Sequence, residues 1–198
     1  MKTKDLFVIV CLLAVIGLSG CDSDEFAERN AYENSRSQWA ELKKAKGNSY
    51  VYRVSRSSWT GWASYTDIQV ENGAVTARSF YKVTPLQHAD GSFRHKKEGG
   101  ILFDTTCVYT ESVNDIGTHE QGDKPLTMDE LYEVYGKYLM VDRKQNTLYF
   151  ETDTQGILKL CGYFPNTCAD DCFRGIDIES FRWLKKITSL SSFGGGSC

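Results

Sequence analysis

The amino-acid sequence predicts an α+β fold in which an antiparallel β-sheet of about six strands carries two helices packed on one face. Three observations predict this class. Several short runs alternate apolar and polar residues, as half-buried strands do. An Asn-Gly pair joins two of these runs. Two segments with helical periodicity each begin at a capping-box motif. Runs of strands interrupted by single helices are typical of α+β proteins.

The first helix is predicted to begin at Ser35, because residues 35–38 have the capping-box form S-x-x-Q. Trp39 and Leu42 then fall on one face of the helix, and Gly47 ends it. The alternating run that follows predicts a strand over residues 50–55, with three large side chains on one face of the sheet.

A β-hairpin is predicted over residues 66–81. Two alternating runs meet at Asn72-Gly73, and a two-residue type I′ turn needs a positive φ at both central positions, which Asn and Gly tolerate. A polar loop leads from this hairpin to a further strand at residues 105–112.

The second helix is predicted over residues 127–139. Thr127 and Glu130 form its capping box, and an apolar stripe that includes Leu131 supplies its buried face. Three more strands fit the remaining alternating runs, and a turn at residues 153–156 joins the first two of them. These strands cover residues 147–152, 157–164 and 176–183.

The N-terminus has the layout of a bacterial lipoprotein signal peptide. Two lysines precede an uncharged segment, residues 6–18, which small residues follow. A permanent transmembrane helix needs about 20 apolar residues, and this segment is shorter. The sequence "LSGC" at residues 18–21 resembles a lipobox, which implies cleavage before Cys21 and acylation of its thiol. An ordinary secretory leader is the alternative.

The expected organisation is a signal peptide at residues 1–20, an acidic tether at 21–33, a single α+β domain at 34–184 and a flexible Ser/Gly tail at 185–198. Acyl chains on Cys21 would anchor the protein to a membrane of the bacterial cell envelope, on the periplasmic side. The choice between inner and outer membrane stays open. The formal net charge is −3, so no basic field predicts binding to nucleic acid.

Cysteine usage agrees with export. Cys11 would leave with the leader and Cys21 would be acylated, and outside the cytoplasm the remaining cysteines favour disulfides. Cys198 is expected to be the spare thiol, because it ends the flexible tail. The disulfide candidates are Cys107, Cys161, Cys168 and Cys172. Four cysteines allow three pairings, and the sequence does not choose among them.

Several segments resemble one family of small bacterial exported proteins and lipoproteins, which is known only as a domain of unknown function. The similar segments are "YVYRVSRS", "IQVENGAV", "TMDELYEVY", "LYFETDTQGILKL" and "GIDIESF". The resemblance covers residues 34–183. It implies the same α+β fold and carries no activity with it.

No motif predicts a catalytic centre. The three histidines lie singly in loops, and Ser79 and Lys82, which match S-x-x-K, point to opposite faces of a strand. A zinc site at Cys161, Cys168 and Cys172 is disfavoured, because their spacing matches none of the usual ligand pairs. The acidic residues nearby suggest a calcium site instead, because Ca²⁺ binds several oxygen atoms at one point. Its weak candidates are Asp170, Asp171 and Asp177.

An aromatic, Ser/Gly-rich connection precedes the predicted hairpin. It contains Trp59, Trp62 and Tyr65, and aromatic residues on loops frequently anchor recognition of a partner. We therefore expect a non-catalytic binding or adaptor module that contacts another envelope protein. A small envelope hydrolase and a calcium-dependent binding module are the alternatives.

Overall fold

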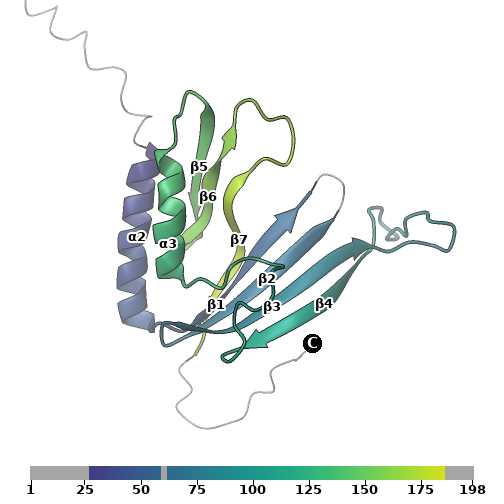
Figure 1. Ribbon diagram of the computed structural model, residues 1–198, viewed down its shortest axis with the longest axis horizontal. Coiled ribbons are helices and arrows are strands. Elements are labelled where there is room, and N and C mark those ends of the chain that lie inside the picture. Colours follow the sequence, from purple (N-terminus) through teal and green to yellow (C-terminus); the bar gives the residue numbers. More distant parts are fainter. Residues whose placement is uncertain (1–26, 59–61, 186–198) are drawn as a thin grey trace, which may run out of the picture.

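The computed structural model describes residues 27–58 and 62–185, which form an α+β fold with an antiparallel sheet and two α-helices (Figure 1). The elements in chain order are α2 (Ala27–Lys46), β1 (Tyr50–Ser57), β2 (Ala63–Glu71), β3 (Ala74–Pro85), β4 (Phe103–Ser112), α3 (Met128–Gly136), the 3-10 helix η1 (Lys137–Met140), β5 (Asn146–Thr152), β6 (Leu158–Pro165) and β7 (Arg174–Trp183). The expected signal peptide, Cys21 and Trp59 lie outside the described residues.

Within the described residues the sheet has seven strands, where the sequence predicts about six. Their order is β4-β3-β2-β1-β7-β6-β5, and every neighbouring pair is antiparallel. β1–β4 form one meander and β5–β7 form a second. The two meanders join where β1 pairs with β7, with Tyr50 opposite Trp183. The β1–β7 pairing joins the two meanders into one continuous sheet. Each alternating segment of the sequence forms a strand of this sheet.

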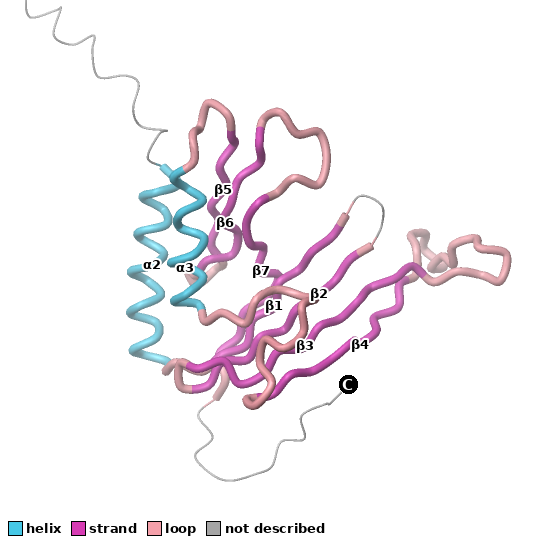
Figure 2. Tube along the Cα trace, in the orientation of Figure 1, coloured by secondary structure: helices cyan, strands magenta, loops and turns pink. Residues whose placement is uncertain are grey.

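Both helices lie on one face of the sheet, which we call the inner face; the opposite face is the outer face (Figure 2). α2 and α3 pack against the β5–β6 side of the sheet. The core between them is rich in aromatic rings. The Trp39 ring stacks on Trp183 with centroids 5.4 Å apart and meets Tyr50 edge-on at 5.2 Å. Each such ring buries about 150–250 Å², so these residues are a major source of stability.

Helix α2 begins at Ala27, which corrects the predicted helix start at Ser35 and the predicted tether up to residue 33. The additional helical turns are held by tertiary packing, because Tyr32 is buried and its hydroxyl donates to the Tyr132 carbonyl at 2.8 Å. Ser35 is therefore inside the helix. Its hydroxyl donates to the Gly156 carbonyl at 2.7 Å instead of capping a helix end.

Two local sequence signals are confirmed. Asn72 and Gly73 have φ values of 51° and 85° in the turn between β2 and β3, as a type I′ turn requires. At the start of α3, the Thr127 side chain accepts from the Glu130 backbone, and the Glu130 side chain accepts from the Thr127 backbone. Both signals act within four residues, so they do not depend on the rest of the fold.

The connection from β4 to α3, residues 113–127, crosses the inner face of β2 and β3, and we call it the strap (Figure 1). A buried carboxylate holds its first half. Glu111, which is 0% exposed, accepts from the backbone N–H groups of Gly117 at 2.6 Å and His119 at 2.8 Å. The guanidinium of Arg78, itself only 3% exposed, lies 3.1 Å from the same carboxylate.

The ionised state of Glu111 is maintained by these donors. Burial alone would raise the pKa of this carboxyl, but the His119 and Gly117 backbone groups, the His119 ring and the Arg78 charge outweigh it and lower the pKa. Arg78 also donates to the His119 carbonyl at 2.7 Å and the Gln121 carbonyl at 3.0 Å. The ion pair therefore fixes the strap through both of its members.

The second half of the strap is tied down at Asp123. Its carboxylate pairs with Arg56 of β1 at 2.5 Å, and its backbone N–H donates to the Thr66 hydroxyl at 2.9 Å. Arg56 also donates to the Gly175 carbonyl of β7 at 3.1 Å. The strap thus connects strands of both meanders.

Candidate recognition site

Trp62 is the described member of the aromatic connection that remains open to solvent. Its side chain is 53% exposed, and its carbonyl accepts a hydrogen bond from the Ser58 N–H at 3.0 Å. Tyr65 has a different environment, because it lies half-buried on the outer face of β2 with its ring centroid 5.1 Å from the Arg53 guanidinium carbon. The structure therefore separates two residues that the sequence groups together, and Trp62 is the one available for contact.

The connection between β6 and β7, residues 166–173, is closed by a disulfide between Cys168 and Cys172, whose Cα atoms are 6.3 Å apart. This pairing confirms two of the four disulfide candidates. The two cysteines are four positions apart in sequence, so the bridge restricts the tip of one loop rather than joining distant elements. The residues between them are exposed.

Phe173 anchors the base of this loop on the outer face. Gly162 and Gly175 lie opposite each other on β6 and β7, and the end of the Phe173 ring occupies the space above them. A Cβ atom added at Gly162 would lie 2.7 Å from Phe173 Cζ, so the loop packs here only because both residues are glycine. Phe164 and Tyr149 extend the row, with ring centroids 5.2 Å from Phe173 to Phe164 and 5.7 Å from Phe164 to Tyr149.

A hydrogen bond ties the β6–β7 loop to Ser58, the residue that follows β1. The Ser58 hydroxyl donates to the Asp171 carboxylate at 2.5 Å, and Asp171 has a φ of 43°. We call Ser58, Trp62 and residues 166–173 together the recognition end. The adjoining ends of β1 and β2 lie on the same side of the sheet as the β6–β7 loop (Figure 1). Trp62 is thereby linked through Ser58 to a loop that a disulfide, a hydrogen bond and the half-buried Phe173 ring keep in place.

Cys161, a third disulfide candidate, is a free thiol, which corrects the expectation for this residue. It lies on the inner face of β6, completely buried, with its Sγ 3.3 Å from the Tyr135 carbonyl oxygen. Burial raises the pKa of this thiol to about 12. The direction of its side chain, into the core, separates it from Cys168 and Cys172, which lie in the exposed loop. Cys107 is disulfide-bonded.

The acidic candidates for calcium occupy different environments. Asp170 is exposed at the loop tip, and Asp171 accepts from Ser58. Asp177 lies on β7 opposite Leu160, and burial raises the pKa of its carboxyl. Across residues 27–58 and 62–185, no three His, Cys, Asp or Glu side chains are grouped so that they could hold a metal ion.

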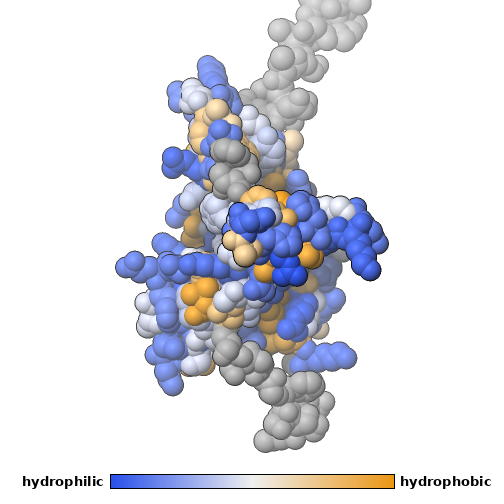
Figure 3. Space-filling view, turned by 90° about the vertical axis from the view of Figure 1, so that its right-hand side faces the viewer, coloured by the Kyte–Doolittle hydropathy of each residue, from blue (hydrophilic) through white to orange (hydrophobic). Residues whose placement is uncertain are grey.

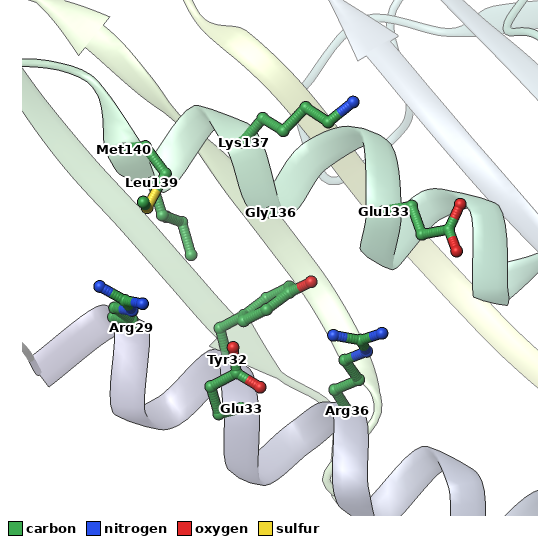
Figure 4. Close-up of a pocket in the computed structure, with 9 residues that line it drawn as sticks. All are labelled: Arg29, Tyr32, Glu33, Arg36, Glu133, Gly136, Lys137, Leu139 and Met140. Carbon is green, nitrogen blue, oxygen red and sulfur yellow. The ribbon is translucent and has the colours of Figure 1, made fainter.

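A groove of about 380 Å³ between α2 and the α3–η1 segment is a second candidate site (Figure 4). The Tyr32 ring stands between the helices against Gly136, where an added Cβ would lie 2.5 Å from the tyrosine hydroxyl. Charges of both signs line the groove, so it does not select an anion or a cation. The lining residues are Arg29, Tyr32, Glu33, Arg36, Glu133, Gly136, Lys137, Leu139 and Met140.

The sequence does not predict this groove, because Arg29, Tyr32 and Glu33, a third of its lining, fall in the predicted tether. The signal was present in the sequence, since Tyr32, Ser35 and Trp39 follow one another at spacings of three and four and are the buried residues of α2. The acidic and basic residues between them concealed the periodicity.

The remaining exposed apolar residues are dispersed. The face shown in Figure 3 is mainly hydrophilic, with small, separate hydrophobic patches. Phe93 and Val113 lie in different connections of the chain, and Met140 is the last residue of η1. Scattered apolar residues of this kind are normal for a protein surface. The recognition end differs from them in that a disulfide and a hydrogen bond to Ser58 restrain its loop.

No protein-family model, curated protein or solved structure matches this chain. Among the described helices, none is both long and apolar enough to cross a membrane.

Proposed function

We propose that this protein is a lipoprotein anchored in the bacterial cell envelope, where it acts as a non-catalytic binding module for another envelope protein. The observation that carries the proposal is the recognition end, in which Trp62 is exposed beside a loop held by the Cys168–Cys172 disulfide. The lipobox-like sequence that ends at Cys21 supports the location.

The rigidity of the recognition end favours binding of a folded partner. Ordering a loop upon association costs about 0.5–1.5 kcal/mol for each immobilised side chain, so a loop ordered beforehand loses less affinity. The disulfide, the Ser58–Asp171 hydrogen bond and the Phe173 contact each order the loop before a partner arrives. Tryptophan is among the residues that most often dominate binding energy when they fill a pocket on a partner.

The position of the anchor agrees with a partner at the same membrane. Residues 22–26 separate Cys21 from Ala27, the first residue of α2, and span at most about 18 Å when fully extended. The N-terminal end of α2 and the β6–β7 loop lie towards the same end of the molecule (Figure 1). Acyl chains on Cys21 would thus keep the recognition end near the bilayer surface.

The test uses a photoreactive amino acid at position 62 and purification from native membranes. We expect one near-stoichiometric crosslinked envelope protein, and we expect Trp62→Ala to lose it in co-purification. Phe93→Ala is the matched control, because Phe93 is an exposed aromatic residue at 43% in a different loop. A partner retained by Trp62→Ala, or lost equally with Phe93→Ala, would contradict the proposal.

If no crosslinked partner is found, the binding-module proposal is rejected and the two alternatives are favoured. Two simple measurements distinguish these alternatives. A calcium-dependent module would show a melting shift with Ca²⁺ that Asp171→Asn abolishes. A hydrolase would lose a screened activity upon substitution of a single histidine or serine.

The anchor is tested separately. Lipidation of Cys21 should give globomycin-sensitive processing and a mass shift that Cys21→Ser removes. An unmodified N-terminus at that position would reject the lipid anchor and leave the recognition end to be judged by the crosslinking experiment.

A further inference from the structure

The groove between α2 and the α3–η1 segment has an apolar floor that is fixed in place (Figure 4). The Tyr32 ring packs against Gly136, and its hydroxyl donates to the Tyr132 carbonyl at 2.8 Å. Leu139, which is 6% exposed, lines the groove together with this ring. Because the hydroxyl proton is already engaged, the floor offers a ligand mainly apolar surface, and polar recognition has to come from the rim.

Five charged side chains form the rim of the groove. Helix α2 supplies Arg29, Glu33 and Arg36, and the facing segment supplies Glu133 on α3 and Lys137 at the start of η1. All five are exposed. Three are basic and two are acidic, so the rim carries a net charge of +1, whereas the whole chain carries −3. A ligand that fits this rim carries charges of both signs.

The rim charges do not neutralise one another by direct contact. Arg29 and Glu33 are four residues apart on α2, and Glu33 and Arg36 are three apart, which are the spacings at which opposite charges on a helix attract each other. Further along the same helix, Glu41 and Lys44 do pair, at 2.7 Å. Across residues 27–58 and 62–185, none of the five rim residues belongs to an ion pair. Their charges are therefore available to a ligand.

One end of the groove is apolar at the surface. Met140, the last residue of η1, is 66% exposed and lies at the same end of the groove as Arg29 (Figure 4). Arg29 belongs to the first turn of α2, so this end is the one nearest to Cys21 along the chain. The inference rests on the proposed function in this one respect, since an acyl anchor on Cys21 keeps this end within reach of the bilayer surface.

We propose that the groove binds the headgroup of a zwitterionic phospholipid from this bilayer, with the phosphate at Arg29 and the ammonium group at Glu33. A guanidinium donates two parallel hydrogen bonds to phosphate oxygens, and a carboxylate accepts from an ammonium group. One helical turn, a rise of about 6 Å, separates the two residues along α2. An ethanolamine headgroup carries its two charges on either side of two methylene groups, and its acyl chains leave the groove past the exposed Met140.

The charge pattern favours this ligand over a singly charged one. An anionic headgroup without an ammonium group would leave Glu33 and Glu133 beside its negative charge. A free cation would meet the larger, basic part of the rim. Placing like charges next to each other lowers affinity, so a zwitterionic headgroup is the phospholipid headgroup that satisfies both parts of the rim.

The test measures headgroup selectivity on the full mature protein, extracted from membranes in a nonionic detergent. Titration calorimetry compares glycerophosphoethanolamine with glycerophosphoglycerol, which has no ammonium group. We expect saturable binding of the first and about tenfold weaker binding of the second, because its complex lacks one charge-assisted hydrogen bond. Native mass spectrometry of the same sample should find phosphatidylethanolamine retained by the protein, which distinguishes a bilayer lipid from a free phosphodiester.

Two variants separate the two charges of the ligand. Arg29→Gln should weaken the binding of glycerophosphoethanolamine by about tenfold, because the phosphate loses its charged donor. Glu33→Gln should remove the preference for glycerophosphoethanolamine over glycerophosphoglycerol. Glu41→Gln is the matched control, since Glu41 lies on α2 outside the groove and should leave both affinities unchanged. All three positions are exposed, so the melting temperature of each variant should stay close to that of the unsubstituted protein.

Equal binding of the two headgroups by the unsubstituted protein, or unchanged selectivity in Glu33→Gln, would overturn the proposal. Tighter binding of dialanine than of glycerophosphoethanolamine would also overturn it and would assign the groove to peptide ends. Binding of the soluble headgroup without retained phosphatidylethanolamine would reject the bilayer as the source of the ligand. The N-terminal mass of the same sample reports acylation of Cys21 independently, so failure of the anchor and failure of the groove are distinguished.

Discussion

Substitution of Glu111 by glutamine is the most direct test of the way the strap is held. Glu111→Gln keeps the size of the side chain but removes the charge that neutralises Arg78, and the two residues are 0% and 3% exposed. Removal of one member of a buried ion pair typically costs about 3–5 kcal/mol, because the other charge stays buried without its counterion. For a domain of this size that corresponds to a decrease in Tm of about 6–20 °C.

The assay is urea and thermal unfolding of the domain at pH 7, compared with Glu41→Gln. Glu41 pairs with Lys44 on α2, but both side chains are about 70% exposed, so that pair contributes at most about 0.5 kcal/mol. Equal losses of stability in the two variants would refute the reasoning, because they would mean that the buried ion pair stabilises the fold no more than the solvent-exposed ion pair does.

The pH dependence supplies a second check on Glu111. Its pKa in the folded protein is lowered from the ordinary value of 4.5, so its ionised form stabilises the fold above that value. The contribution should disappear as the pH falls from the ordinary pKa through the folded one. The free energy of unfolding of Glu111→Gln should therefore approach that of the unsubstituted protein at acidic pH.

Three further outcomes are expected. Gly136→Ala should destabilise the domain by about 1–3 kcal/mol in urea unfolding, because the new Cβ would collide with the Tyr32 ring. Cys161 should resist alkylation at pH 8 in the folded protein and react at once in denaturant, since burial raises its pKa to about 12; labelling at equal rates would contradict its burial. Tyr132→Phe should cost about 1–3 kcal/mol in chemical denaturation, because the Leu158 N–H, 2.9 Å from the lost hydroxyl, stays buried without a partner.

Local signals predicted the fold well. The Asn72-Gly73 turn and the Thr127 capping box depend on neighbouring residues alone, and both are present as the sequence predicts. The start of α2 was misplaced because Ser35 and Gln38 have the form of a cap, whereas burial of Tyr32 against α3 extends the helix to Ala27. Tertiary contacts decided that boundary, and no local motif records them.

The recognition end could be predicted only in part. The sequence shows that the segment around Trp62 is aromatic and predicts that it is a loop. Its proximity to the Cys168–Cys172 loop results from the pairing of β1 with β7, which the sequence does not show. The free state of Cys161 follows from the face of β6 on which it lies. The number of cysteines does not show which face of the sheet each side chain lies on, because a shift of one residue along a strand moves a side chain to the opposite face.

The pairing of Tyr50 with Trp183 also determines when the protein can fold. These partners come from β1 and β7, the first and the last of the described strands, so the central junction of the sheet cannot form until β7 has emerged. Contacts between such distant segments slow folding, because the entropy of closing a long loop must be lost first. Until then, the β1–β4 meander has an unpaired edge at β1. Unpaired strand edges can form hydrogen bonds with other chains and so promote aggregation. Pairing of β7 with β1 covers this edge, so the risk of aggregation is greatest before β7 is available.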